Sequence, residues 1–131
     1  MFFTRECDYA IRVVRDLANQ EMKPVKTICE REKIPHPFAY KILKKLEHAG
    51  IVNSYRGAVG GYQLAKPPES ITLFDIVNAV DDSLLINECL QKGYVCSRDL
   101  NGNSCGVHRE LMKIQALLEK ALIEQTMENL I

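Results

Sequence analysis

Apolar residues in the first third of the chain recur at every third or fourth position, which is the spacing of amphipathic helices. One series follows Thr4, a residue that can cap a helix, and it contains Cys7, Ala10, Ile11, Val14, Leu17 and Ala18. A shorter series follows Pro24 and contains Val25, Ile28 and Cys29. After a break at residues 33–35, a third series contains Phe38, Ala39, Ile42, Leu43, Leu46 and Ala49. The pattern predicts three helices. Pro37 is expected at the first position of the third helix, and Gly50 just past its end.

The outer face of the third predicted helix is polar and basic. It carries Tyr40, Lys41, Lys44, Lys45 and His48. Two short helices, a tight break and a basic second helix are typical of a helix-turn-helix. Because most helical hairpins do not bind DNA, the following segment has to support this interpretation.

That segment has the pattern of a β-hairpin. Residues 51–52 and 62–65 are strand-like, and the glycine-rich residues 56–61 between them predict a tight tip with glycines at positive φ. A hairpin directly after a recognition helix is a wing, and Arg56 near its tip would reach into a minor groove of DNA. The alternative is an ordinary hairpin with a solvated arginine.

The remainder of the chain predicts a short helix, a loose loop and a long helix. Thr72 and Asp75 have capping-box spacing before Leu73, Ile76, Val77 and Val80. The last helix starts near Gly106, and its apolar positions alternate in steps of four and three, as in a coiled-coil seam. That seam comprises Val107, Leu111, Ile114, Leu118, Ala121 and Gln125. We expect a two-fold homodimer through this helix, with packing onto the chain's own domain as the alternative.

The predicted fold is therefore mainly α with a small β-wing, in three parts. Residues 1–80 form a winged helix-turn-helix, residues 81–105 a cysteine-bearing loop, and residues 106–131 a dimerisation helix. A chain of 131 residues, 47% of them hydrophobic, is sufficient for one domain with an appendage.

Charge is distributed unevenly although the net charge is zero. Residues 23–66 contain nine Lys or Arg against three Asp or Glu, whereas residues 67–131 contain five against ten. The basic middle segment indicates an anionic partner such as double-stranded DNA, with a solvated charged surface as the alternative. No window is long and apolar enough for a membrane span, and the first residues lack the apolar run of a signal peptide, so we expect a cytoplasmic protein without a membrane partner.

The five cysteines fall into two groups. Cys7 and Cys29 sit at helical apolar positions and are expected in the core, and a reducing cytosol argues against disulfides. Cys89, Cys96 and Cys105 lie with His108 in one polar stretch, and three thiolates with one imidazole suit iron–sulfur or zinc ligation. Zinc sites usually use closely spaced cysteine pairs, whereas longer gaps can wrap a larger cluster, although spacing alone does not decide between them. Three cysteines and a histidine suit a 2Fe–2S cluster.

An enzyme is not expected. The sequence shows no convergent acid–base set near the cysteines. The glycines at 57–61 lie in a hairpin rather than before a helix, so they do not match a nucleotide-binding loop.

The segment RGAVGGYQLAKPPESITLFDIVNAVDD, from Arg56 onward, resembles the Rrf family of bacterial winged-helix transcriptional regulators. The stretches TRECDYAIRVVRDLA and KILKKLEHAGIV are also similar, so the resemblance extends over essentially the whole chain. It implies a DNA-binding regulator; whether it represses or activates its targets stays open. The family includes iron–sulfur cluster regulators of the IscR type and nitric oxide sensors of the NsrR type.

The resemblance also implies a set of ligands. Cluster-bearing members hold three cysteines in the loop before the dimerisation helix, where Cys89, Cys96 and Cys105 stand. IscR-like proteins use a histidine three residues after the third cysteine, which corresponds to His108, whereas NsrR-like proteins can use an acidic residue of the partner subunit, which corresponds to Asp8. The gaps of six and eight residues between the cysteines differ from IscR, so a 4Fe–4S cluster remains the alternative to 2Fe–2S.

We therefore expect a cytoplasmic, homodimeric regulator that senses iron–sulfur or redox status through its cluster. The alternatives are a cluster-free member that responds to thiol oxidation or a partner protein, and an NsrR-like nitric oxide sensor. Tyr40 stands where IscR-like proteins carry a base-reading glutamate. The residues expected to contact DNA are His36, Tyr40, Lys41, Lys44, Lys45, Arg56, Gly60 and Gly61.

Overall fold

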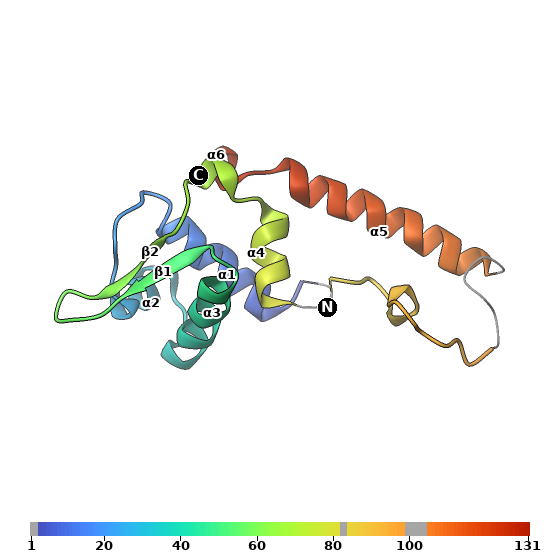
Figure 1. Cartoon of the computed structure of the whole chain (residues 1–131), viewed down its shortest axis with the longest axis horizontal. Helices are drawn as coiled ribbons and strands as arrows, with labels where there is room; N and C mark the ends of the chain where they lie inside the picture. Colours follow the sequence, from blue (N-terminus) through green and yellow to red (C-terminus); the bar gives the residue numbers. More distant parts are fainter. Residues whose placement is uncertain (1–2, 82–83, 99–104) are drawn as a thin grey trace.

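The computed structural model describes residues 3–81, 84–98 and 105–131 (Figure 1). The helices are α1 (Arg5–Asp16), α2 (Val25–Glu32), α3 (His36–His48), α4 (Leu73–Val80), α5 (Gly106–Glu124) and α6 (Met127–Leu130). Strands β1 (Val52–Tyr55) and β2 (Gly61–Leu64) form an antiparallel sheet, and short 3₁₀ turns occur at η1 (Pro68–Ser70) and η2 (Glu88–Leu90). The mainly helical fold with a small wing is confirmed. None of the helices described here is long and apolar enough to span a membrane.

The predicted caps fix the ends of two core helices. Thr4 precedes α1, and its Oγ1 accepts a hydrogen bond of 3.3 Å from the backbone nitrogen of Cys7. Before α4, Thr72 Oγ1 accepts from the Asp75 nitrogen over 3.1 Å, and Asp75 Oδ2 accepts from the Thr72 nitrogen over 3.0 Å. These reciprocal bonds are the predicted capping box. They stabilise the start of α4 because they satisfy backbone donors that a helix leaves free at its start. Helices α1, α3 and α4 then pack against one another around the core.

Helix α3 differs from the prediction at both ends. It begins at His36, so Pro37 occupies its second position rather than its first. Phe38, expected in the core, is 43% exposed and packs edge-on against Tyr9 with 5.7 Å between ring centroids. Ala49 is exposed because the helix has ended there, and Gly50 then adopts φ +77°, as predicted for a helix terminus.

The wing is a four-residue pairing from Val52 opposite Leu64 to Tyr55 opposite Gly61. Gly57 in the tip has φ +113°, as expected. The same expectation is wrong for Gly60 and Gly61, which are not at positive φ. These two positions require glycine because there is no space for a side chain. A Cβ at residue 60 would overlap the carbonyl oxygen of Tyr55, and a Cβ at residue 61 would overlap the carbonyl oxygen of Lys23.

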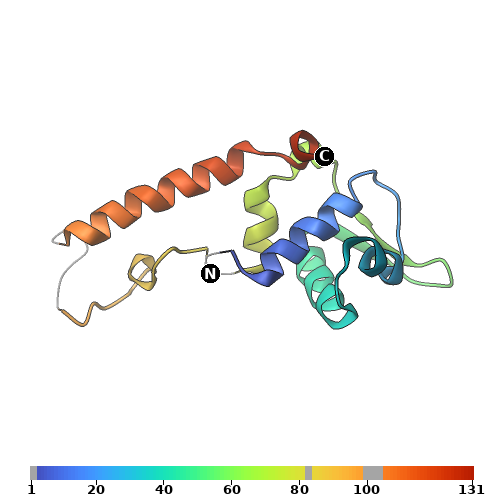
Figure 2. The ribbon, with the colours of Figure 1, turned by 180° about the vertical axis from the view of Figure 1, so that it is seen from behind.

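Helix α5 is anchored at its C-terminal end and projects from the body at its N-terminal end, as both views show (Figures 1 and 2). The anchor consists of two backbone hydrogen bonds. The Leu73 nitrogen donates to the Gln125 oxygen over 3.0 Å, and the Met127 nitrogen donates to the Ile71 oxygen over 2.8 Å. Residues 84–98 run out beside the projecting part of α5, and the η2 turn lies against it. The rest of the predicted loop, residues 82–83 and 99–104, lies outside the described residues.

The apolar face of α5 is divided between two environments. Leu122 is buried against the body, and Leu111 and Leu118 are half-buried. Val107 and Ile114 of the predicted seam are exposed to 69% and 45% in the single chain. Ala121 and the neighbouring Leu117 are also exposed. Packing on the chain's own domain therefore uses one side of the helix and leaves an uncovered apolar stripe, consisting of Val107, Ile114, Leu117 and Ala121.

Candidate DNA-binding groove and cysteine pocket

A groove of about 780 Å³ lies between the start of α2, the outer face of α3 and the wing. His36, Tyr40 and Lys44 line it from α3, because residues four apart lie on one face of a helix. Arg56, Gly60 and Gly61 line it from the wing. Six of the eight residues predicted to contact DNA therefore meet at one surface.

Lys41 and Lys45, the other two, do not line this groove. Their Nζ atoms bind the carboxylate of Glu6 on α1, at 2.6 Å from Oε1 and 2.8 Å from Oε2 respectively. Lys45 also donates to the backbone oxygen of Val80 over 3.2 Å. Hydrogen bonds from the two lysines hold the pKa of Glu6 below its ordinary value. These lysines thus connect α3 to α1 and to the end of α4.

The groove contains residues that the sequence pattern did not single out. Lys26 lines it from the first turn of α2, and Tyr55 and Tyr62 line it from the strands. Burial raises the pKa of the Tyr62 hydroxyl. The sequence did contain a signal for these residues. Tyr55 and Tyr62 flank the glycine-rich tip on its two sides, and they come to line one groove when the strands pair.

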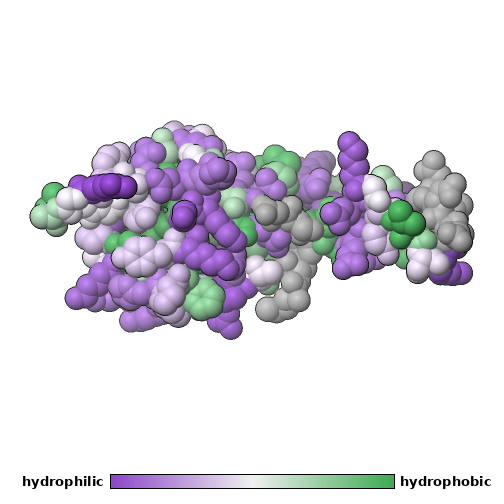
Figure 3. Space-filling view, turned by 60° about the horizontal axis from the view of Figure 1, so that its bottom comes forward, coloured by the Kyte–Doolittle hydropathy of each residue, from purple (hydrophilic) through white to green (hydrophobic). Residues whose placement is uncertain are grey.

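The wing ends in an apolar tip. Val59 is 81% exposed, and in the space-filling view the far left end of the molecule is green against a mostly purple body (Figure 3). A charged side chain, Arg56, and an apolar tip therefore lie on the same short hairpin.

A second pocket, of about 520 Å³, lies between residues 87–98 and the first turn of α5. All four predicted ligands line it: Cys89, Cys96, Cys105 and His108. Cys105 is the N-cap of α5, and its Sγ accepts a hydrogen bond of 3.4 Å from the His108 nitrogen.

The four donors line one pocket but are not gathered around one point. Within the described residues, no three His, Cys, Asp or Glu side chains are close enough to hold one ion. In donor type and number, three thiols and one imidazole on the walls of one pocket fit either an iron–sulfur cluster or a zinc ion.

The remaining cysteines are in the core, as predicted. Cys7 is fully buried, and burial raises the pKa of the Cys29 thiol. The three cysteines at the pocket are half-buried instead.

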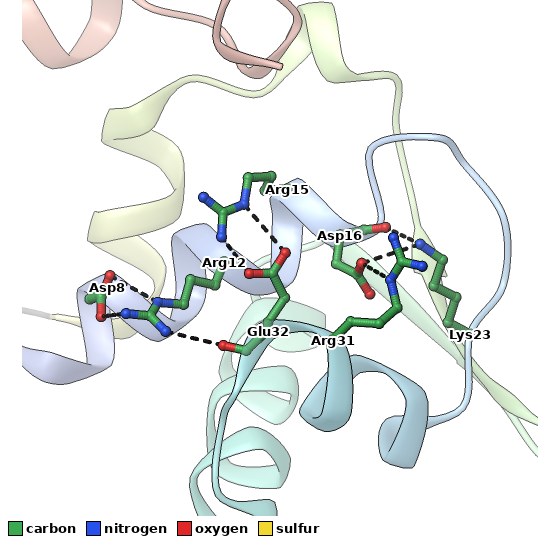
Figure 4. Close-up of polar contacts among 7 residues, drawn as sticks. All are labelled: Asp8, Arg12, Arg15, Asp16, Lys23, Arg31 and Glu32. Atoms are coloured by element: carbon green, nitrogen blue, oxygen red, sulfur yellow. Dashed lines mark hydrogen bonds and ion pairs between the residues drawn. The ribbon is translucent and has the colours of Figure 1, made fainter.

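Asp8, the rival ligand, does not line the cysteine pocket of its own chain. Its Oδ2 lies 2.9 Å from Arg12, and Arg12 donates over 3.1 Å to the backbone oxygen of Glu32 at the end of α2 (Figure 4). Within one chain, Asp8 therefore supports the contact between α1 and α2.

The model of the Rrf2 family, described as an iron-dependent transcriptional regulator, matches residues 3–131. The chain belongs to the Rrf2 family. Membership makes it a DNA-binding transcriptional regulator and not an enzyme.

Individual relatives agree with this assignment. A protein of Aquifex aeolicus named as an HTH-type transcriptional regulator is 31% identical over all of this chain and 92% of its own length. IscR of Escherichia coli O1:K1 is 35% identical over 71% of this chain, and the match spans only 59% of IscR. The match to an HTH-type regulator of Synechocystis, 46% identical, likewise spans 59% of that protein.

Solved structures show the same fold. IscR of T. potens has a TM-score of 0.73 at 24% identity, over 97% of this chain and 83% of that one. CymR, titled the global cysteine regulator of B. subtilis, has a TM-score of 0.73 at 24% identity, over 97% of this chain and 93% of that one.

Proposed function

We propose that this Rrf2-family regulator carries an iron–sulfur cluster, 2Fe–2S in preference to 4Fe–4S, and that the state of the cluster controls its affinity for operator DNA. The proposed ligands are Cys89, Cys96, Cys105 and His108. The observation that carries the proposal is their position on the walls of a single pocket at the projecting end of α5.

The ligands come from two segments with different attachments. Cys105 and His108 belong to the start of α5, whereas Cys89 and Cys96 belong to the loop beside it. When bound, a cluster would supply a group sensitive to redox state, with a potential that the histidine tends to raise. The four side chains would hold the loop against α5 only while all of them are engaged.

A contact route leads from this loop to the proposed DNA surface. The loop follows α4, whose last residue, Val80, accepts a hydrogen bond from Lys45 of α3. Helix α3 also presents His36, Tyr40 and Lys44 to the groove. A shift of the loop would therefore act on α3 through the end of α4.

On the DNA side, we propose that α3 enters a major groove and that Arg56 of the wing reaches the adjacent minor groove. The uncovered apolar stripe of α5 would pair with the same stripe of a second copy. A two-fold dimer would then present two recognition helices to a pseudo-palindromic operator.

Purification without oxygen, followed by absorption and Mössbauer spectroscopy, tests the cluster. We expect a brown protein with two irons per chain. Cys96→Ser should lose the spectrum, whereas Ser97→Ala, a change at the neighbouring loop position, should retain it. A colourless protein in which Cys89, Cys96 and Cys105 are all free thiols would contradict the proposal.

Thiol oxidation is the second candidate, because three half-buried thiols face one pocket. It requires a colourless protein in which mass spectrometry finds a disulfide among Cys89, Cys96 and Cys105 after mild oxidation, together with a change in operator affinity.

A further inference from the structure

The wing is supported on its outer edge by the connection between α1 and α2. Lys23 and Tyr62 exchange two backbone hydrogen bonds, each 2.9 Å long, so the connection pairs with β2 as a short antiparallel bridge. Gly61 provides the space for this approach, since a Cβ there would overlap the Lys23 carbonyl. The position of β2, and hence of the wing, depends on where Lys23 is held.

The Lys23 side chain is held inside the domain, which is unusual for a lysine in a connection. Its side chain is 10% exposed, and Nζ lies 3.5 Å from Oδ1 of Asp16, whose side chain is 2% exposed. Nζ also donates to the Asp16 backbone oxygen. Both residues are shown converging at the end of α1 in Figure 4.

Arg31 of α2 completes this group, with Nε at 2.6 Å from the same Asp16 Oδ1. The second carboxylate oxygen, Oδ2, is buried and accepts no hydrogen bond from any described residue. A buried ammonium is costly unless a charged partner compensates it. Asp16 is therefore the residue that makes the buried position of Lys23 tenable.

We infer that Asp16 is a positioning residue for DNA binding: through Lys23 it fixes the edge to which β2 is bonded, and thereby the direction in which Arg56 meets the operator. This inference rests on the proposed role of the wing. The carboxylate of Asp16, buried at the end of α1, would thus affect DNA affinity although it does not contact DNA. The charged side chain of Lys23 would anchor the connection to Asp16, and its backbone would hold β2. Lys23 itself would not contact DNA.

The test measures operator affinity by fluorescence anisotropy at one fixed salt concentration, on the full chain. Asp16→Asn and Lys23→Met should each weaken binding about tenfold, the scale of one lost groove contact. The double variant should bind the operator only slightly more weakly than either single variant, because both substitutions break the same contact between Asp16 and Lys23. Arg15→Met is the matched control: it removes the neighbouring α1–α2 ion pair with Glu32, which does not involve the wing, and should leave affinity unchanged.

A cycle with Arg56→Ala separates positioning from a general loss of stability. If Asp16 acts through the wing, Arg56→Ala should cost much less affinity in the Asp16→Asn chain than in the unmodified chain. The amides of Lys23 and Tyr62 should also exchange hydrogen faster in Asp16→Asn. If Asp16→Asn does not fold, Lys23→Met, which leaves the Asp16–Arg31 pair intact, serves in the same cycle.

The outcomes are distinguishable. Full operator affinity in both Asp16→Asn and Lys23→Met, or effects that add to that of Arg56→Ala, would overturn the inference while leaving the wing as a DNA contact. An Arg56→Ala protein with unchanged affinity would refute the wing's role itself, and the positioning of the wing by Asp16 with it.

Discussion

The side-chain amide of Gln115 on α5 donates a hydrogen bond of 2.6 Å to the backbone oxygen of Leu84. Its Oε1 accepts another, of 2.9 Å, from the Ile86 nitrogen, and the residue is buried. Gln115 thus fastens the start of the cysteine loop to α5 without any metal. The part of the loop beyond it, which bears Cys89 and Cys96, lacks such a clamp among the bonds described and would depend on its ligands.

Replacing Gln115 by Met should detach the start of the loop, because two backbone groups would lose their buried partner. We expect the free energy of unfolding to fall by about 2 kcal/mol, the scale of unsatisfied buried groups. Denaturant unfolding measures this, with Lys113→Met as a control on the exposed side of α5. We also expect faster loss of cluster absorbance in air. Equal stability of both variants would show that the clamp is unimportant.

Glu6 should contribute to stability only while it is ionised. At pH 7, Glu6→Gln should lower the free energy of unfolding by about 1 kcal/mol, since it removes charge-assisted bonds to Lys41 and Lys45. The pKa of Glu6 is lower in the folded protein than its ordinary value of 4.5. The contribution is therefore complete above pH 4.5 and is lost as the pH falls through the folded-state pKa. Unfolding curves of both proteins should converge on acidification; a constant gap down to low pH would contradict this.

The lysines of α3 should differ in their effect on DNA binding. Lys44 faces the groove, whereas Lys45 is bound to Glu6 and Val80. Lys44→Ala should lower operator affinity and reduce the slope of log affinity against log salt by about 1, as expected for one lost phosphate contact. Lys45→Ala should change the slope much less. Titrations at several salt concentrations would reveal a reversed order, which would place the DNA on the other face of α3.

The fourth cluster ligand can be decided by substitution. His108→Ala should give a labile cluster, and Asp8→Ala an almost normal one, because His108 lines the pocket of its own chain, whereas Asp8 would have to come from the partner subunit. His108→Cys should keep a cluster with a lower reduction potential, since thiolate donates more charge than imidazole. Anaerobic absorption spectra and redox titration measure both. Loss of the cluster in Asp8→Ala with a retained spectrum in His108→Ala would favour a ligand from the partner subunit.

The uncovered stripe of α5 should hold the dimer. Ile114→Asp would place an unpaired carboxylate in the proposed interface, so we expect monomers by light scattering. Lys113→Asp introduces the same charge one residue away, outside the stripe, and should remain dimeric. A dimeric Ile114→Asp protein would mean that another surface holds the two copies together.

Local pattern was sufficient to predict helices α1 to α4 and the wing, whereas the last helix, predicted over residues 106–131, ends at Glu124 and is followed by the separate helix α6. Thr4, Thr72 and Asp75 mark helix starts because a side-chain oxygen beside a helix start satisfies free backbone donors wherever the helix packs. The same applies to Gly50 and Gly57, whose positive φ is a property of their own backbone. Cys7 and Cys29 were predictable as core residues from helical spacing alone.

The candidate cluster site was predictable in composition but not in form. The cysteines and His108 stand out in the sequence, whereas their position around one pocket depends on α5 lying beside residues 84–98. Whether a basic side chain is free for DNA is likewise not a local property. Lys41 and Lys45 look equivalent to Lys44 along the helix, and only the packing of α1 against α3 brings Glu6 to them.

The sequence by itself determined where the capped helices begin, which positions are apolar, and which residues are candidates for metal or DNA binding, because these depend on neighbours a few residues away. Only the tertiary structure decided the exposure of Phe38 at the rim of the core, the close approach that requires Gly61, and the buried pairing of Lys23 with Asp16. Those outcomes depend on which distant segments meet and how much water remains between them.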